Sequence, residues 1–238
     1  MTAGSTLIKK NNRKEIIVSD WDGVIQDIDF YWMTKLIREY DKYAPYFDFT
    51  KIQKDGVWAT EKVWDRDTYY MNTWLAKEGV EIPTEIVEDF VKMYIDDDSF
   101  YFHCPFMIMA ETIRNIVAEP FIEHVYFLSS APKNYAIDPR KSIMLEKFFG
   151  KSKKISLEIL HGNTPKSTWI NEHVPEYTLF IDDRSDIVRD VIDHTNSDNK
   201  QYILPCYRHN TELGNDLAYI KACSDRGIVI STYKSELI

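Results

Sequence analysis

The stretch "IIVSDWDGV" (residues 16–24) decides the fold class and locates a candidate site. A run of strand-forming apolar residues ends in Asp20 and Asp22, and Gly23 follows at once. Side chains two positions apart on an extended chain point the same way, so the two carboxylates lie on one side and Trp21 on the other. Carboxylates this close repel each other unless a cation or a shared proton lies between them. A solvated turn is the alternative interpretation, and this stretch alone does not decide between the two.

Apolar runs of strand length recur along the chain, each bounded by polar or turn residues. The predicted strands are Ile16–Ser19, Val125–Leu128, Ile155–Leu160, Thr178–Ile181 and Gln201–Pro205. Helical patterns lie between several of them, at 106–120, 167–174 and 185–194. Strands that alternate with helices indicate a parallel sheet. We therefore expect an α/β, Rossmann-like fold with a parallel sheet and helices on both of its faces.

The segment 27–102 interrupts this alternation, because it reads as helices that are rich in Trp and Tyr. Its helical patterns lie at 30–44, 63–79 and 84–98. We therefore predict a core formed by residues 1–26 and 103–238, with a helical cap inserted at 27–102.

Each main strand of the predicted sheet runs directly into chemically active residues. The four groups are Asp20 with Asp22, Ser129 with Ser130, the segment 161–166 (HGNTPK), and Asp182 with Asp183. In an open parallel sheet, ligands bind outside the carboxyl ends of the strands. We therefore expect the four groups to converge on one crevice.

The doublet Asp182 and Asp183 has two interpretations. One of Asp183, Ser185 or Asp186 is expected to cap the following helix, whose positive dipole end favours carboxylates. Capping does not explain why two acids end an apolar strand, whereas a hard cation does. Mg²⁺ prefers oxygen ligands and needs only one or two carboxylates in addition to waters and a phosphate oxygen. The doublet therefore predicts a magnesium site.

Lys166 stands in an unfavourable place for a lysine. Thr164 is expected to cap a helix and Pro165 to be its first residue. Lys166 then lies in the first turn, where a cation opposes the helix dipole by ~0.3–1 kcal/mol. A phosphate beside the ammonium would compensate for this. An exposed surface lysine is the alternative interpretation, and Lys133 is a rival for the same role.

In order and spacing, these groups resemble the motifs of the haloacid dehalogenase superfamily of phosphohydrolases. Residues 20–24 (DWDGV) are similar to its first motif, D-x-D-G, and 127–130 (FLSS) to its second, an apolar strand that ends in Ser or Thr. Lys166 is similar to the third motif and 180–184 (FIDDR) to the fourth. The insertion 27–102 resembles the helical cap of the superfamily's first cap class.

The resemblance implies roles for the acidic residues. Asp20 is the nucleophile that forms an aspartyl-phosphate. Asp22 protonates the leaving oxygen and then activates the water that cleaves the intermediate. Mg²⁺ is held by a carboxylate oxygen of Asp20, the backbone carbonyl of Asp22 and Asp183, with Asp182 acting through a metal-bound water.

The resemblance also implies a phosphate-binding set, formed by Ser129, Ser130 and Lys166. The two serines alone are ordinary helix-capping residues, although a hydroxyl and backbone N–H groups at a strand-to-helix turn also form an anion site. Dehalogenase members lack an acid at the position of Asp22, because halide leaves without a proton, so its presence favours phosphoryl transfer. The "DDR" and "SSAP" segments are similar to 5'(3')-deoxyribonucleotidases, and "DDR" also to the phosphatase half of polynucleotide kinase-phosphatases.

These features predict a Mg²⁺-dependent phosphomonoester hydrolase with a small phosphorylated substrate. Aromatic residues of the insertion favour a nucleoside monophosphate, since aromatic faces stack on bases. Aromatic residues at helical spacing are nevertheless more often core residues, so a sugar phosphate or another small phosphomonoester is the alternative. A non-catalytic binding module of the same fold is a second alternative, but such a module would usually have lost one of the acids.

Composition narrows the choice of partners. The chain has 238 residues and a formal net charge of -9, which repels polyanions and disfavours tight, non-specific nucleic-acid binding. Cys104, Cys206 and Cys223 have the spacing of neither a metal site nor a disulfide framework. No run approaches the roughly 18 apolar residues of a membrane helix. We expect a cytoplasmic protein without membrane contact; its oligomeric state is not predicted.

Overall fold

The computed structural model describes residues 14–28, 99–131, 137–162, 164–205 and 215–233, with short pieces at 53–54, 57–58, 88, 92 and 213. Most of the predicted insertion 27–102 lies outside these ranges, and so does Lys133. The division into core and cap therefore stays a prediction. Within the insertion, β2 (Gln53–Lys54) and β3 (Val57–Trp58) form an antiparallel pair.

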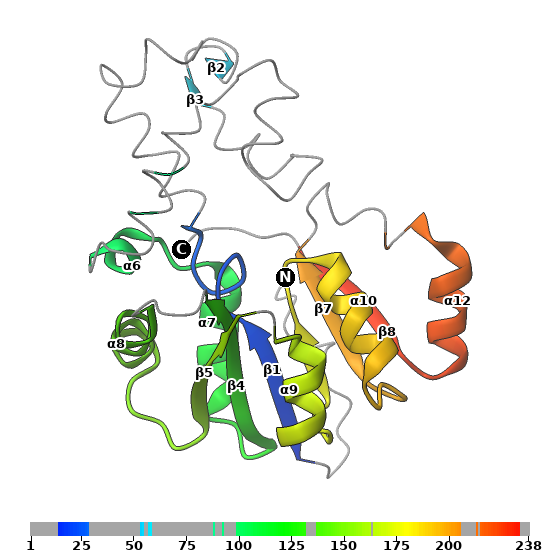
Figure 1. The fold of residues 1–238 in the computed structure, drawn as a ribbon. Helices are drawn as coiled ribbons and strands as arrows, with labels where there is room; N and C mark the ends of the chain where they lie inside the picture. The colour runs from blue at the N-terminus through cyan, green and yellow to red at the C-terminus, as the bar shows by residue number, and fades with distance from the viewer. Residues whose placement is uncertain are drawn as a thin grey trace.

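A six-stranded parallel sheet forms the centre of the molecule (Figure 1). Its strands are β1 (Glu15–Asp20), β4 (Ile122–Ala131), β5 (Ile155–His161), β6 (Leu179–Ile181), β7 (Gln201–Pro205) and β8 (Val229–Tyr233). They are arranged in the order β5-β4-β1-β6-β7-β8. The chain therefore builds outward from β1 on one side, through β4 and β5, and then crosses back to build the other side from β6.

Helices cover both faces of the sheet, as predicted. The helices are α6 (Phe100–His103), α7 (Ile108–Val117), α8 (Ile137–Phe149), α9 (Lys166–His173), α10 (Ser185–His194) and α12 (Leu217–Asp225). Residues of α6, α7 and α8 pack in one core cluster with Ile17 of β1. Residues of α9, α10 and α12 pack in the other with Ile16 and Val18. Figure 1 shows α9 in front of the sheet and α7 behind it. The alternation along β1 thus places successive side chains in opposite layers.

The α/β, Rossmann-like fold is confirmed, and all five predicted strands are present. The helix predicted at 185–194 is also confirmed as α10, and its Val188, Val191 and Ile192 are buried. The strand β8 and the helices α8 and α12 were not predicted. One helix start was wrong by a residue: Pro165 precedes α9, and Lys166 is its first residue. The hydroxyl of Thr164 donates instead to the carbonyl of His161, 3.2 Å away.

The chain turns sharply where it leaves β1. Gly23 adopts a φ of +77°, which L side chains rarely tolerate. The backbone N–H groups of Ile25 and Gln26 both donate to the carbonyl of Trp21, at 2.8 and 3.2 Å. Trp21 itself is fully buried, with its ring 5.3 Å from that of Phe127. Trp21 therefore anchors one side of the "DWDG" stretch in the apolar core, whereas Asp20 and Asp22 lie outside that core.

Hydrogen bonds of the buried Gln26 side chain connect this turn to the segment that follows the predicted insertion. The side chain of Gln26 accepts from the Trp21 indole at 3.0 Å and donates to the carbonyls of Tyr101 (2.9 Å) and Cys104 (3.1 Å). The backbone N–H of Asp27 donates to the carbonyl of Pro105 at 3.0 Å. The chain therefore leaves the core and returns to it at adjacent points.

Among the described residues, we find no helix that combines the length and the apolar character needed to cross a bilayer.

Candidate active site

The candidate site lies at the carboxyl edge of the sheet, where the strand order reverses. β1 pairs with β4 on one side and with β6 on the other. Asp20 at the end of β1 is therefore flanked by Ser129 of β4 and by Asp182, directly after β6. The crevice at such a reversal is where open parallel sheets bind their ligands. Topology alone thus brings together three of the four groups that the sequence singled out.

Lys166 bridges two of the acidic residues. Its ammonium donates to Asp20 Oδ1 at 2.6 Å and to Asp182 Oδ2 at 2.7 Å, and all three side chains are nearly or fully buried. Residues 146 and 16 positions apart in the chain meet here because α9 begins directly beside β1 and β6. A buried ammonium that donates to two carboxylates is well compensated, whereas an unpaired one would be costly.

Burial and neighbouring charges shift the pKa values of Asp20 and Lys166. Burial raises the pKa of Asp20 from its ordinary 3.8 to about 7; Lys166 opposes the change, and the carboxylates of Asp182 and Asp22 add to it. Burial by itself would lower the pKa of Lys166, but the charges of Asp182 and Asp20 outweigh it and raise that pKa. Lys166 is therefore fully charged at neutral pH, and Asp20 sits among more negative charge than one lysine offsets.

Asp183 completes a cluster of three carboxylates. One oxygen from each of Asp20, Asp182 and Asp183 lies within 4.8 Å of the others, and Asp182 and Asp183 are buried. Gly23 makes room for this arrangement: a Cβ on it would lie 2.2 Å from Asp183 Oδ2. The absence of a side chain at Gly23 is therefore a steric requirement as well as a conformational one.

The three-carboxylate cluster suits a hard divalent cation. Its donors are all oxygens, and Mg²⁺ prefers oxygen ligands. Asp20 and Asp182 share the single ammonium of Lys166, so their two carboxylates carry more negative charge than this lysine offsets. A divalent ion would offset the excess. The predicted Mg²⁺ ligands Asp20, Asp182 and Asp183 are thus brought together.

The Asp22 side chain belongs to a second group, on the β4 side. Its Oδ2 accepts from Lys141 Nζ at 2.6 Å and from Ser129 Oγ at 3.3 Å, and Lys141 Nζ also donates to Ser129 Oγ. Lys141 lies on α8 and is fully buried. The only part of Asp22 that was predicted to hold Mg²⁺ is its backbone carbonyl, and its carboxylate faces Lys141.

Sequence reasoning missed Lys141, because the apolar stripe of α8 that would mark its position is weak. Lys141 stands three residues before Met144 and seven before Phe148, and both of these pack in the core layer below the sheet edge. It therefore occupies a core-facing position of an amphipathic helix. A lysine in such a stripe needs a buried partner, and the acidic residues at the strand ends are the available ones.

The remaining predicted residues divide between the site and other places. Ser129 is fully buried within the Asp22 group, whereas Ser130 points to the opposite face of β4 and is exposed. The predicted cap of α10 by Asp183, Ser185 or Asp186 is wrong: Arg184 is the N-cap residue, and the helix has no side-chain capping hydrogen bond. Asp182 Oδ1 instead accepts from the backbone N–H of Arg184 at 3.0 Å, directly before α10.

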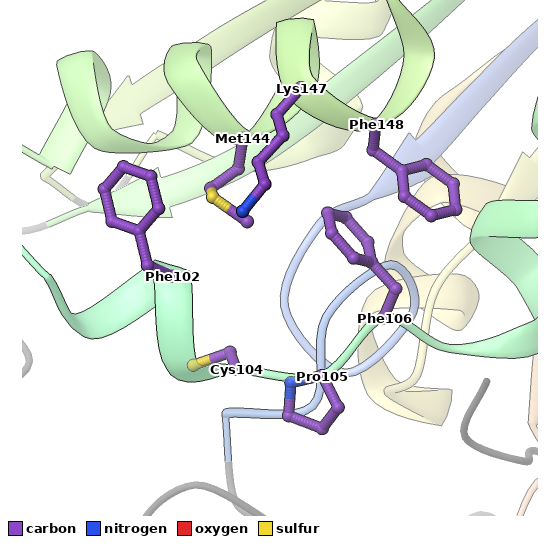
Figure 2. A pocket seen from close by; sticks show the side chains of 7 residues that line it. All are labelled: Phe102, Cys104, Pro105, Phe106, Met144, Lys147 and Phe148. Carbon is purple, nitrogen blue, oxygen red and sulfur yellow. The ribbon is translucent and has the colours of Figure 1, made fainter.

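A separate apolar pocket of about 470 Å³ lies between α6 and α8 (Figure 2). It is lined by Phe102, Cys104, Pro105, Phe106, Met144, Lys147 and Phe148. None of these residues belongs to the acidic groups described above. Figure 2 shows Met144 and Lys147 reaching down from α8 between the rings of Phe102 and Phe106.

Comparison with known proteins gives similarity in structure only. The sequence matches no protein-family model and no curated protein. A haloacid dehalogenase-like family hydrolase from Streptococcus pneumoniae is 9% identical, with a TM-score of 0.52 over 93% of this chain and 94% of that chain. A haloacid dehalogenase-like hydrolase from Burkholderia xenovorans LB400 is 13% identical over 93% and 95%, with a TM-score of 0.46. One from Xanthomonas campestris is 10% identical over 91% and 99%, with a TM-score of 0.43.

The similarity to the Streptococcus pneumoniae structure shows that this chain has the fold of a haloacid dehalogenase-like hydrolase. It covers nearly the full length of both chains, so it extends beyond the sheet. This is the fold that the four motifs of the sequence predict.

Proposed function

We propose that the protein is a Mg²⁺-dependent phosphomonoester hydrolase that passes through an aspartyl-phosphate on Asp20. The observation that carries the proposal is the pairing of two acids with two separate buried lysines at one sheet edge. Asp20 contacts Lys166, and Asp22, two residues on, contacts Lys141. A nucleophile and an acid–base group need different surroundings, and this arrangement supplies them.

In the first half of the reaction, a carboxylate oxygen of Asp20 attacks phosphorus. The bond between phosphorus and the leaving oxygen breaks, and that oxygen takes a proton from the Asp22 carboxyl. Lys166 places positive charge beside the attacking carboxylate, which offsets its repulsion of the phosphate dianion. The hydroxyl of Ser129, buried beside Asp22, is in position to donate to a phosphoryl oxygen.

In the second half, Asp22 accepts a proton from a water molecule. The resulting hydroxide oxygen bonds to phosphorus, the bond from phosphorus to Asp20 breaks, and inorganic phosphate leaves. Asp22 then carries the proton that it gave away in the first half. Both halves therefore use the same two aspartates, with opposite directions of proton transfer at Asp22.

Asp20, Asp183 and the backbone carbonyl of Asp22 are the proposed ligands of Mg²⁺, with Asp182 behind a water. The ion, when bound, neutralises charge on the phosphoryl oxygens. The fit of these residues to the ion rests on the buried oxygen cluster and on the single ammonium that Asp20 and Asp182 share.

A nucleoside monophosphate is the proposed substrate, with a sugar phosphate as the competing choice. The supporting features are the Trp and Tyr residues of the segment 27–102, whose rings can stack on a base, and the net charge of -9, which disfavours long polynucleotides as substrates. A panel of nucleoside monophosphates and sugar phosphates, assayed with Mg²⁺, separates the two classes by their kcat/KM. Preference for a sugar phosphate would change the substrate and leave the chemistry intact.

The chemistry is tested by trapping the intermediate. Wild-type protein mixed briefly with a substrate labelled in its phosphoryl group, and then quenched in acid, should retain label that hydroxylamine releases, as an acyl phosphate does. Asp20→Asn should retain none. An active wild-type protein that never becomes labelled under rapid quenching would remove the covalent step, and a protein inactive on every phosphomonoester would remove the function.

A further inference from the structure

The buried lysine of α8 is a neighbour of Asp22 and has no role of its own in the reaction steps proposed above. Lys141 has no exposed side-chain surface, and it is the fifth residue of a 13-residue helix that packs against the sheet. Fully buried lysines are rare, because the ammonium loses its hydration unless protein groups replace it. A lysine kept in this position requires a reason connected with what it touches.

The partners of Lys141 are specific. An ammonium has three donors and no acceptor. It donates to Asp22 Oδ2 at 2.6 Å and to Ser129 Oγ, and it lies 5.0 Å from the centroid of the Tyr101 ring, a cation–π contact. These contacts come from three different parts of the fold: the turn after β1, the end of β4 and helix α6. Lys141 thus fixes the relative positions of groups that are distant in the chain.

The contact decides which oxygen of Asp22 is available for chemistry. Oδ2 accepts from both Lys141 and Ser129, whereas Oδ1 is buried and has no hydrogen-bond partner among the described residues. A buried carboxylate oxygen without a partner is costly in a resting protein. The arrangement therefore presents one specific oxygen of Asp22 for a reacting group and holds the other.

Ser129 is oriented by the same ammonium. Since Lys141 can only donate, the serine oxygen accepts, and the serine hydrogen must point elsewhere. Without a ligand it points to Asp22 Oδ2, at a long 3.3 Å. A hydrogen bond of that length is weak, so the serine hydrogen is readily redirected to a phosphoryl oxygen.

We propose that Lys141 is a positioning residue for proton transfer: it clamps Asp22 through Oδ2, so that Oδ1 exchanges the proton with the leaving oxygen and later with water. This role rests on the proposed function. It differs from the role of Lys166, which contacts Asp20 and Asp182. Removal of Lys141 should therefore slow the reaction mainly with leaving groups that need a proton from Asp22. Removal of Lys166 should slow the reaction with every leaving group.

The experiment compares two leaving groups. p-Nitrophenol leaves as a stable anion and needs little protonation, whereas the alcohol of glycerol 2-phosphate needs a proton. Single-turnover release of each alcohol with Mg²⁺ isolates the first half of the reaction. For Lys141→Met we expect release from the alkyl phosphate to fall by about 10²-fold, the lower range for loss of a general acid. Release from the aryl phosphate should fall by less than about tenfold.

Lys147→Met is the matched control, because Lys147 lies on the same helix and is exposed. It should leave both rates unchanged. An equal loss on both substrates in Lys141→Met, with wild type active, would overturn the role of Lys141 and leave the phosphatase function standing. A wild type inactive on both would overturn the two proposals together.

A double-mutant cycle shows whether Lys141 acts through Asp22. On the aryl phosphate, Lys141→Met should have no further effect once Asp22→Asn is present, whereas a lysine that binds phosphate directly would cost the same in both backgrounds and raise KM. If Lys141→Met does not fold, Lys141→Cys treated with bromoethylamine regenerates an ammonium of nearly the same length. Recovery of the alkyl-phosphate rate, with wild type alkylated in parallel, supports the role; absence of recovery in a folded, fully modified protein contradicts it.

Discussion

Lys166 and Lys141 are alike in chemistry and differ in how the chain delivers them. Each is buried and donates to one of the two aspartates of the "DWDG" stretch. Lys166 is the first residue of α9, on one layer of the sheet, whereas Lys141 lies inside α8, on the other. Helices on both faces of the sheet therefore contribute a lysine to the site, and each of the two neighbouring aspartates forms an ion pair with a different lysine. Position in the fold, and not residue type, distinguishes the proposed nucleophile from the proposed acid–base group.

The largest expected effect removes the acid on the Lys166 side. Asp20→Asn should lower turnover by at least on the order of 10⁴-fold, because it removes the proposed nucleophile. The fold should survive, since burial already disfavours the charge that the substitution deletes. Steady-state kinetics with Mg²⁺ and circular dichroism measure the two expectations.

Asp186→Asn is the control for Asp20→Asn, because the Asp186 side chain is mostly exposed and forms an ion pair with Arg184, outside the acidic cluster. It should retain full turnover. Substantial activity in Asp20→Asn would break the comparison, because the two lysines would then no longer serve a nucleophile and an acid.

The next effect sharpens the contrast between the two lysines. Lys166→Met should reduce single-turnover release from aryl and alkyl phosphates by the same factor, about 10²–10³-fold, since the proposed role of Lys166 is to offset charge at Asp20 whatever the leaving group. The ratio of the two rates is the measured quantity. If the ratio changes as it does in Lys141→Met, the two lysines do not have different roles. Lys221→Met, on the exposed side of α12, is the control.

A glycine substitution tests the metal cluster alone. Gly23→Ala places a Cβ 2.2 Å from Asp183 Oδ2, in addition to the strain of a φ of +77°. Gly150→Ala has similar strain, with a φ of +72°, but no atom within 4 Å of the added Cβ. Both should lose about 1–2 kcal/mol of unfolding free energy from strain. Only Gly23→Ala should weaken the apparent affinity for Mg²⁺, because its Cβ displaces Asp183 Oδ2. We expect a loss of about tenfold or more, which corresponds to at least about 1.4 kcal/mol of binding free energy.

Equal Mg²⁺ affinities in the two glycine variants would show that Asp183 is not held in place for the ion. Calorimetric titration of Mg²⁺ into each variant, together with denaturant unfolding without Mg²⁺, makes the comparison.

The smallest effect concerns pH. Because the folded-state pKa of Asp20 is raised from 3.8 to about 7, the folded metal-free protein binds more protons than the unfolded chain between these values. Its stability from this group is therefore full below about pH 4 and is lost as the pH rises through about 7. Mg²⁺ requires the ionised carboxylate, so the stabilisation that Mg²⁺ gives should grow over the same interval.

Thermal unfolding with and without Mg²⁺, from pH 5.5 to 8, tests this expectation. The gain in Tm on adding Mg²⁺ should be larger at pH 8 by a few °C, since about 1 kcal/mol corresponds to roughly 2–4 °C for a chain of this size. A gain in Tm that does not change with pH would contradict the proposal that Asp20 is a ligand of Mg²⁺.

The sequence predicted the parts of the fold whose signal is local. The strands β1 and β4 are apolar runs that are buried in both layers, and such runs are easy to detect. β8 escaped detection because it is a sheet-edge strand with a partly exposed, mixed sequence, Val229–Tyr233. α8 begins "IDPRKS", with a proline in its first turn and a weak apolar stripe, so its helical period is hard to see.

The same distinction explains the two lysines. Lys166 violates a local rule, because a cation at a helix start opposes the dipole, and the violation is visible in the sequence. Lys141 violates only a tertiary rule, because lysine is an ordinary helix residue until its face is known to be buried. Its partners, Asp22 and Ser129, are 119 and 12 positions away in the chain. Only the folded sheet brings the three together.

The contacts of Gln26 and Asp27 with the segment 101–105 have a consequence for how this protein can be modified. Since the chain exits and re-enters the sheet domain side by side, the length of peptide between residues 28 and 99 adds little strain to the fold, and closure entropy rises only slowly with length. A short linker in that place should give a minimal protein that retains the aspartate–lysine chemistry. On the proposal that the segment 27–102 contacts the substrate, transplanting another insertion onto the same base should change the substrate preference.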